Sequence, residues 1–169
     1  GLKEMTFLGN TISSTGVSPN KQKVTDFLAS LKTPKTPKQI RRFIGFFQYF
    51  RSFIPNLGEK LLPFYRVLRT GTEQSLTEEH YACIEKLRKD LEQACDMSLR
   101  LPKPDAQYVI LTDASFYAAG YVLMIEDYIT SQSGKKFKSY VPVSFGSKIF
   151  SPTYLKLSIY AKEDRKSVV

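Results

Sequence analysis

Cysteine is scarce in this sequence. Among 169 residues the only cysteines are Cys83 and Cys95. They lie twelve positions apart in a stretch with helical periodicity, which is a poor geometry for a disulfide. We therefore expect two buried thiols in a reducing, intracellular compartment, and not a disulfide-bonded secreted fold.

The features of membrane and secreted proteins are also missing. No window reaches the roughly 18 uninterrupted apolar residues that a membrane-spanning helix needs. The first residues, GLKEMTFLGN, do not show the charged-then-apolar layout of a signal peptide. The sequence contains no internal repeat and no low-complexity tract. Its 42% hydrophobic and 13% aromatic content predicts a folded protein with one good core or two small ones, and no membrane partner.

Acidic residues are rare in the first part of the chain. Residues 1–70 carry twelve Lys or Arg but only three acidic residues, so the whole net charge of +9 lies there. Residues 71–169 carry equal numbers of each sign. A solvated charged face is the usual explanation of a basic stretch, whereas an excess confined to one segment indicates a polyanionic partner. Nucleic acid is the leading candidate, because phosphate neutralisation needs clustered Lys and Arg.

The N-terminal third predicts a strand pair followed by helices. Residues Lys3–Ser13 form two short apolar runs around Gly9, and Gly16 and Pro19 mark a break. From Asn20 the spacing becomes helical, with apolar residues recurring on one stripe through Leu31. This helix ends at Thr33-Pro34-Lys35.

Two further helices follow, with clear boundary signals. Thr36-x-x-Gln39 fits a capping box with Pro37 in the first turn, and Pro55 is expected to end this helix. Phe46, Tyr49 and Phe53 widen its apolar stripe, which predicts burial of much of the helix surface. A third helix is expected over Leu57–Leu68, broken at Pro63.

The polar stretch Thr70–Ser75 is the best candidate domain boundary. Thr77 then caps a helix whose apolar positions are Tyr81, Ile84, Leu87, Leu91 and Ala94.

The stretch Tyr108–Ile125 carries the strongest strand signal. Its two apolar runs suit strands buried on both faces, and Asp113 lies between them. A carboxylate at the end of a buried strand is costly unless it is hydrogen-bonded or bound to a metal, but Asp113 and Ser115 also suit a simple turn. We expect an exposed loop over Glu126–Lys136, a strand over Phe137–Ser144 with an edge or irregular position at Pro142, and a last helix from Ser151.

Taken in order, these segments resemble the Pol polyprotein of long-terminal-repeat retrotransposons and retroviruses. MTFLGNTISSTGVSPNKQKV resembles the end of the reverse transcriptase palm, and KTPKQIRRFIGFFQYFRSFIPNLGEKLLP resembles the thumb helices. LPKPDAQYVILTDAS and PVSFGSKIFSPTYLKLSIYAKE are similar to the first strand, third strand and following helix of ribonuclease H. The resemblance implies an α+β fold: a small helical thumb and connection unit, followed by a truncated ribonuclease H-like sheet with helices.

The resemblance also divides the chain into parts. Residues 1–19 correspond to the primer-grip strands at the end of the palm, and 20–70 to the helical thumb. Residues 71–104 correspond to a connecting helix and linker, and 105–169 to a partial ribonuclease H-like domain.

Specific roles follow from the same resemblance. Asp113 and Glu163 match two of the carboxylates that hold two Mg²⁺ ions in ribonucleases H, although Glu163 by itself reads as an ordinary exposed helix residue. The resemblance also implies contacts with an RNA–DNA hybrid or primer–template duplex. The candidate nucleic-acid-binding residues are Phe7, Leu8, Gly9, Lys35, Lys38, Arg41, Arg42 and Arg51.

The sequence departs from the family pattern at two places. The polymerase aspartates would precede Gly1 and two further nuclease aspartates would follow Val169, so we expect this chain to be an incomplete piece of a larger Pol polyprotein. After Glu163 the polar run Asp164–Ser167 replaces an aliphatic helix face. We therefore expect no polymerase activity and little or no ribonuclease activity from the isolated chain. The alternatives are a co-opted, non-catalytic nucleic-acid-binding or assembly domain, and a generic basic DNA-binding module.

Overall fold

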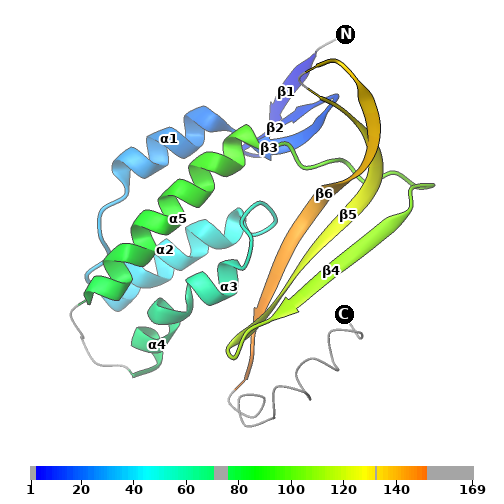
Figure 1. Ribbon diagram of the computed structural model, residues 1–169. Coiled ribbons are helices and arrows are strands. Elements are labelled where there is room, and N and C mark those ends of the chain that lie inside the picture. The colour runs from blue at the N-terminus through cyan, green and yellow to red at the C-terminus, as the bar shows by residue number, and fades with distance from the viewer. Residues whose placement is uncertain (1–2, 71–75, 132, 152–169) are drawn as a thin grey trace.

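The computed structural model describes residues 3–70, 76–131 and 133–151. In these ranges a group of helices lies beside a long, twisted three-stranded sheet, and a second three-stranded sheet lies at one end of the helices (Figure 1). The α+β class expected from the sequence is confirmed. None of the helices in the described ranges is long and apolar enough to cross a membrane.

The helices begin where the capping signals place them. Asn20 Oδ1 accepts a hydrogen bond from the Lys23 N–H, and Thr36 Oγ1 accepts one from the Gln39 N–H, which completes the predicted capping box. At Thr77 the backbone N–H donates to Nδ1 of His80. The helices are α1 (Lys21–Ser30), α2 (Pro37–Tyr49), α3 (Leu57–Lys60), α4 (Leu62–Thr70) and α5 (Glu78–Asp96).

One hydrophobic core joins all five helices. The apolar stripe of α2 is buried as predicted, and it packs with residues of α1, α4 and α5. Phe47, Phe64 and Leu87 are completely buried in this core. The helix of residues 78–96 therefore shares its core with the helices before it, while the four-part division of the chain remains a prediction.

Two predicted helix boundaries were wrong. α2 ends at Tyr49, before Pro55, yet Phe50 and Ile54 are still buried. The chain there continues in tight turns, with hydrogen bonds such as the Phe53 N–H to the Phe50 carbonyl, and such turns preserve a near-helical spacing. The break in the third helix falls at Leu61, because Pro63 lies in the first turn of α4, where its missing N–H is harmless.

The smaller sheet has the order β1-β2-β3, with β1 (Glu4–Phe7), β2 (Asn10–Ser13) and β3 (Gly16–Pro19). The expected β1–β2 pair is confirmed, and Gly9 has φ of 81° at its turn. The break expected over Gly16–Pro19 was wrong. Val17 pairs with Ile12 and also forms a β-bridge with Leu99, a residue far from it in sequence.

The larger sheet has the order β4-β5-β6, all antiparallel, with β4 (Tyr108–Ala114), β5 (Ala118–Thr130) and β6 (Lys136–Ile149). The irregularity expected at Pro142 is confirmed, because the register shifts between Leu123 and Met124 and leaves Val143 without a partner. β6 is an edge strand, as its proline requires.

Two predictions about this sheet were wrong. The loop expected over Glu126–Lys136 is shorter, because β5 runs to Thr130 and β6 begins at Lys136. The expected burial of β4 on both faces is also wrong, since Ile110 is 49% exposed and Leu111 is 53% exposed. A continuous apolar run identifies a strand but not what covers it. The last helix, expected from Ser151, and Glu163 lie outside the described residues, as does most of the Thr70–Ser75 boundary.

Candidate nucleic-acid interface and carboxylate site

The outer face of α2 is basic. Lys38, Arg41 and Arg42 stand three and four positions apart, so they share one face of the helix, and all three are exposed. The opposite face, with Ile40 and Phe43, is buried in the core. Burial of the apolar stripe therefore fixes the direction in which the three cations project.

These cations have no acidic counterpart within the described part of the chain. The six ion pairs there, such as the Lys60–Asp90 pair, involve none of Lys38, Arg41 and Arg42, nor the exposed Lys35 and Arg51. Positive charge that no carboxylate neutralises is available to a polyanion. The five predicted cations thus lie in or next to one helix, Lys35 before its start and Arg51 after its end.

A cavity of about 280 Å³ adjoins this face, between the end of α1 and the start of α2. Arg42 and Lys32 contribute to its lining together with the rings of Phe27 and Phe43. Gln39 fixes the backbone just before α2, because its Oε1 accepts hydrogen bonds from the N–H groups of Lys35 and Thr36. The start of α2 is therefore held in place with its basic side chains left in solvent.

The turn between β1 and β2 contains the other predicted nucleic-acid-binding residues, Phe7, Leu8 and Gly9. Phe7 is 54% exposed and Leu8 is 72% exposed, and both Leu8 and Gly9 have positive φ, as a tight hairpin turn requires. The Tyr49 hydroxyl donates to the Leu8 carbonyl. Tyr49, the last residue of α2, thus holds the β1–β2 turn. Its side chain links the apolar tip of that turn to the helix that carries the basic face.

The exposed position of Tyr49 differs from the sequence reading. Its place on the apolar stripe predicted a core residue, but the side chain is 53% exposed. An added Cβ at Gly9 would come within 3.1 Å of the Tyr49 hydroxyl, so the glycine lets the ring lie against the turn. Helical spacing alone cannot distinguish a ring in the core from one that packs on a neighbouring hairpin.

Asp113 lies near the end of β4, directly opposite Gly120 of β5, and its carboxylate is exposed. Oδ1 accepts a hydrogen bond from the N–H of Ala114. A small polar pocket beside it is also lined by Asn56, Glu59 and Ser115. The sheet face that carries Asp113 is therefore turned toward the helical part of the molecule.

Glycine permits this close approach. Asn56, just before α3, has φ of 52°, and a Cβ at Gly120 would overlap its Oδ1. Two hydrogen bonds from backbone N–H groups hold the same junction: the Gly58 N–H donates to the side-chain Oγ of Ser147 at 2.7 Å, and the Phe145 N–H donates to the Ser52 carbonyl at 2.9 Å. The position of Asp113 relative to the helices is fixed by these contacts.

The oxygen-rich surroundings of Asp113 suit a hard cation such as Mg²⁺, because carboxylate, amide and hydroxyl oxygens are its usual ligands. Among the described residues, however, no group of three or more His, Cys, Asp or Glu side chains is placed to hold a metal. Glu163, the predicted second ligand, is outside those residues. Asn56 and Glu59 were not predicted, since only the packing of helix on sheet brings them to Asp113.

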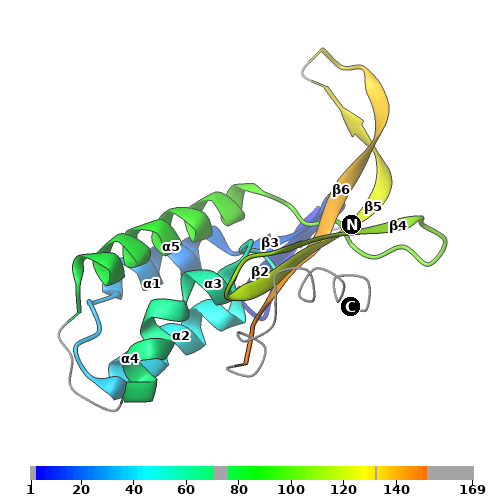
Figure 2. The same ribbon diagram turned by 60° about the horizontal axis from the view of Figure 1, so that its bottom comes forward.

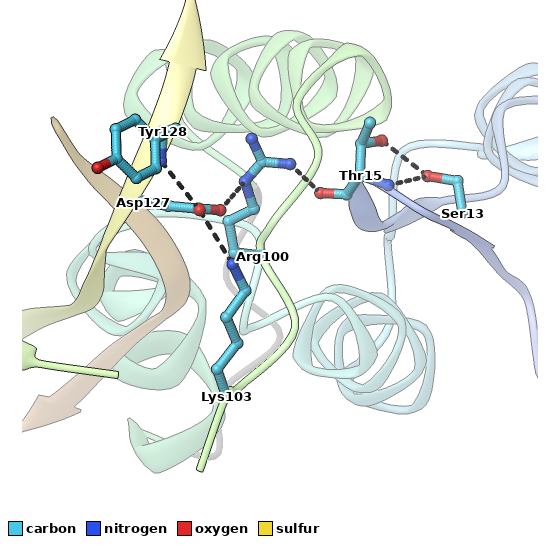
Figure 3. A network of polar contacts seen from close by, with 6 residues as sticks. All are labelled: Ser13, Thr15, Arg100, Lys103, Asp127 and Tyr128. Atoms are coloured by element: carbon cyan, nitrogen blue, oxygen red, sulfur yellow. Dashed lines mark hydrogen bonds and ion pairs between the residues drawn. The ribbon is translucent and has the colours of Figure 1, made fainter. Parts of the chain in front are cut away.

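A polar network ties the two sheets together (Figure 3). Arg100 Nε pairs with Asp127 at 3.2 Å, and the same guanidinium donates to the Thr15 carbonyl. Lys103 Nζ lies 2.9 Å from Asp127, and its hydrogen bond is the main cause that lowers the pKa of this carboxyl, followed by the hydrogen bond from the Tyr128 N–H. The linker after α5 is thereby fastened to β5 on one side and to the β2–β3 turn on the other.

The chain is similar to known polyproteins of mobile elements. It is 33% identical over 162 residues to the retrovirus-related Pol polyprotein from transposon 297 of Drosophila melanogaster, a match that covers 95% of this chain and 14% of that protein. It is 29% identical over 160 residues to the transposon Tf2-3 polyprotein of Schizosaccharomyces pombe, covering 95% of this chain and 11% of the relative. The chain therefore spans about one seventh of these relatives or less. No protein-family model matches it.

Solved structures agree on the fold. The foamy viral protease-reverse transcriptase in complex with dsDNA superposes with a TM-score of 0.77 at 24% identity, over 99% of this chain and 33% of that chain. The same enzyme in complex with RNA/DNA hybrid gives 0.74 at 23% identity, over 98% of this chain and 22% of that chain. At these identities the likeness shows the fold alone. By sequence this chain is a homologue of one segment of the retrovirus-related Pol polyproteins, and it shares the fold of part of the foamy viral protease-reverse transcriptase.

Proposed function

We propose that this chain is the part of a retroelement reverse transcriptase–ribonuclease H that holds the nucleic-acid duplex. In this proposal the α2 face binds the phosphate backbone, and the β1–β2 turn lies against the primer strand. The observation that carries it is the exposed face of Lys38, Arg41 and Arg42, which no acidic side chain of the described chain neutralises. The free thiols of Cys83 and Cys95 support an intracellular site of action.

The chemistry of this face favours shape-dependent binding. Lys and Arg contacts to phosphate oxygens set the register of a duplex but carry no sequence information. Each such contact releases condensed counterions, so affinity falls steeply with salt. The binding proposed here is therefore independent of base sequence, which separates it from a generic sequence-specific DNA-binding module.

We further propose that Asp113, with Glu163, contributes to a ribonuclease H metal site. Asp113 supplies a carboxylate whose polar surroundings, Asn56, Glu59 and Ser115, fit a hard cation. When bound, Mg²⁺ would activate water and stabilise the leaving oxygen of the scissile phosphate. The residues of this chain would orient the ions beside a duplex held by α2.

We also propose that these 169 residues alone bind nucleic acid without cleaving it efficiently. The chain matches only two of the ribonuclease H carboxylates, Asp113 and Glu163, and two carboxylates alone do not normally hold two Mg²⁺ ions.

The test compares Arg41→Ala/Arg42→Ala with a matched control, Lys86→Ala/Lys89→Ala. The control also removes two exposed cations from a helix, but in α5 these stand among glutamates such as Glu85. Fluorescence anisotropy would measure binding to an RNA–DNA hybrid at several salt concentrations. Because each duplex phosphate contact contributes about 0.9 to the slope of log affinity against log salt, the α2 variant should flatten the slope by about 1.8.

Circular dichroism would verify that both variants fold. The proposal expects the control to bind as the unsubstituted chain does, and hybrids of unrelated sequence to bind alike. An unchanged salt slope in the α2 variant, or equal losses in both variants, would contradict it.

A further inference from the structure

The β5–β6 hairpin extends beyond the rest of the large sheet. β4 pairs with β5 only as far as Ile125, so residues 126–130 and 136–140 form a two-stranded ribbon, which we call the distal ribbon. Figure 2 shows it projecting away from the helices and from β4. No third strand pairs with this part of β5 and β6, and the face opposite to Asp127, which Arg100 and Lys103 hold, is available to a partner.

One face of the distal ribbon alternates tyrosine and lysine. Tyr128 lies opposite Lys138, Thr130 opposite Lys136, and Glu126 opposite Tyr140. Residues directly opposite in an antiparallel pair share a face, so the two tyrosines lie on the same side as the two lysines. Tyr128 is 60% exposed and Tyr140 is 45% exposed. Both tyrosines are therefore exposed on a surface that also carries positive charge.

The acidic residues of the ribbon are already engaged. Glu126 lies 3.0 Å from Lys138 Nζ, and Asp127, on the other face, is held by Arg100 and Lys103. Within the described ranges Lys136 and the adjacent Lys135 of the loop take part in no ion pair. The tip of the ribbon is thus positively charged, which suits a polyanion better than a second copy of the same ribbon.

We propose that the distal ribbon binds single-stranded nucleic acid, with Tyr128 and Tyr140 stacking on unpaired bases and Lys135 and Lys136 contacting phosphates. The two tyrosines are diagonal neighbours across the strands, about 7–8 Å apart at their backbones, a spacing at which both can contact one strand. Bases inside a duplex present only their edges, so stacking selects unpaired segments. The inference rests on the proposed function only in that the partner is a nucleic acid. It assigns this chain a second contact, separate from α2.

The experiment measures anisotropy of labelled 12-nucleotide oligo-dT and oligo-rU with the full 169-residue chain. Tyr128→Ala/Tyr140→Ala should weaken binding at least tenfold, since each base–aromatic stack contributes substantially. Tyr128→Phe/Tyr140→Phe keeps the rings and should bind within twofold of the unsubstituted chain. Tyr81→Ala is the matched control, because Tyr81 is an equally exposed tyrosine, 45%, on α5.

The salt dependence of oligo-dT binding tests the phosphate contacts of Lys135 and Lys136. Lys135→Ala/Lys136→Ala should flatten the salt dependence of oligo-dT binding by about 1.4, because each single-strand phosphate contact contributes about 0.7. The same variant should leave hybrid binding through α2 unchanged. If the unsubstituted chain bound oligo-dT but not the RNA–DNA hybrid, the proposed function would be refuted and this inference would stand.

Three results would overturn the inference. One is unchanged oligo-dT binding in Tyr128→Ala/Tyr140→Ala, with folding verified by circular dichroism. Another is a loss of equal size in the phenylalanine variant, which would exclude stacking. The third is sedimentation equilibrium showing self-association that the alanine variant abolishes while oligo-dT binding persists, since the ribbon would then pair with a second copy.

Discussion

Replacing Gly16 by alanine should destabilise the protein more than its short strand suggests. Gly16 has φ of 144°, a conformation that residues with a side chain rarely adopt. An added Cβ would lie 2.8 Å from the carbonyl carbon of Leu99 and still closer to its oxygen. Two hydrogen bonds of 2.8 Å between Val17 and Leu99 hold that backbone in place, so the clash cannot be relieved by rotating a side chain.

The magnitude follows from two contributions. Forcing a residue with a Cβ into this φ costs about 1–3 kcal/mol. Separating β3 from Leu99 loses two backbone hydrogen bonds, at about 0.5–1.5 kcal/mol each. Together they lower the free energy of unfolding by about 2–6 kcal/mol, a large share of the roughly 5–15 kcal/mol that stabilises a typical domain.

Urea unfolding followed by circular dichroism would measure the effect, with two glycines as controls. Gly134 also has positive φ, 82°, but nothing lies near its added Cβ, so Gly134→Ala should cost only about 1 kcal/mol. Gly45 lies in α2 with open space around it, and Gly45→Ala should stabilise by about 0.5–1 kcal/mol. If Gly16→Ala cost no more than Gly134→Ala, the reasoning about the Leu99 contact would be refuted.

Two further predictions concern ionisable groups. Burial raises the pKa of the Cys83 thiol from 9.0 to about 11, so at pH 8 this thiol should react with a thiol reagent about 100-fold more slowly in the native protein than in urea, and the stability that the protonated thiol contributes should be lost as pH rises from 9 toward 11. The rates are measured in Cys95→Ser, which leaves Cys83 as the single cysteine, and equal rates in the native and urea-unfolded protein would contradict this. The lowered pKa of Asp127 stabilises the fold above the ordinary value of 3.8, so Asp127→Asn should lower the urea midpoint at pH 7, and the difference should disappear as pH falls below 3.8. A difference between Asp127→Asn and the unsubstituted chain that is the same at pH 7 and pH 3 would show that the charge is not responsible.

The helices were predictable because their signals are local. The capping box of Thr36 and Gln39 and the cap at Asn20 each depend on residues within four positions, and the structure has both. The apolar stripe of α2 identified its buried face because 3.6-residue periodicity is a property of the helix itself. Once the buried face of α2 was identified, the remaining residues, which include Arg41 and Arg42, predicted a basic outer face.

The strands were less predictable because their partners are distant. β3 was missed because its pairing to Leu99 joins residues more than eighty positions apart. Residues 126–130 of the distal ribbon were taken for part of a loop because most of them are polar, whereas the strand predicted over Phe137–Ser144 lies within β6. Tyr49 was assigned to the core, although its contact is with the turn at Leu8.

The sequence by itself determined the helices, their buried stripe, the unbalanced positive charge and the kinship with Pol polyproteins, because each is written in neighbouring residues or in their order. Only the tertiary structure decided that Asn56 and Glu59 meet Asp113, that Arg100 fastens the two sheets, and that Tyr128 and Tyr140 share one face of a projecting ribbon. Those contacts depend on strand register and on close approach at single glycines. A change of one residue in register reverses the face of every side chain, so no local pattern specifies them.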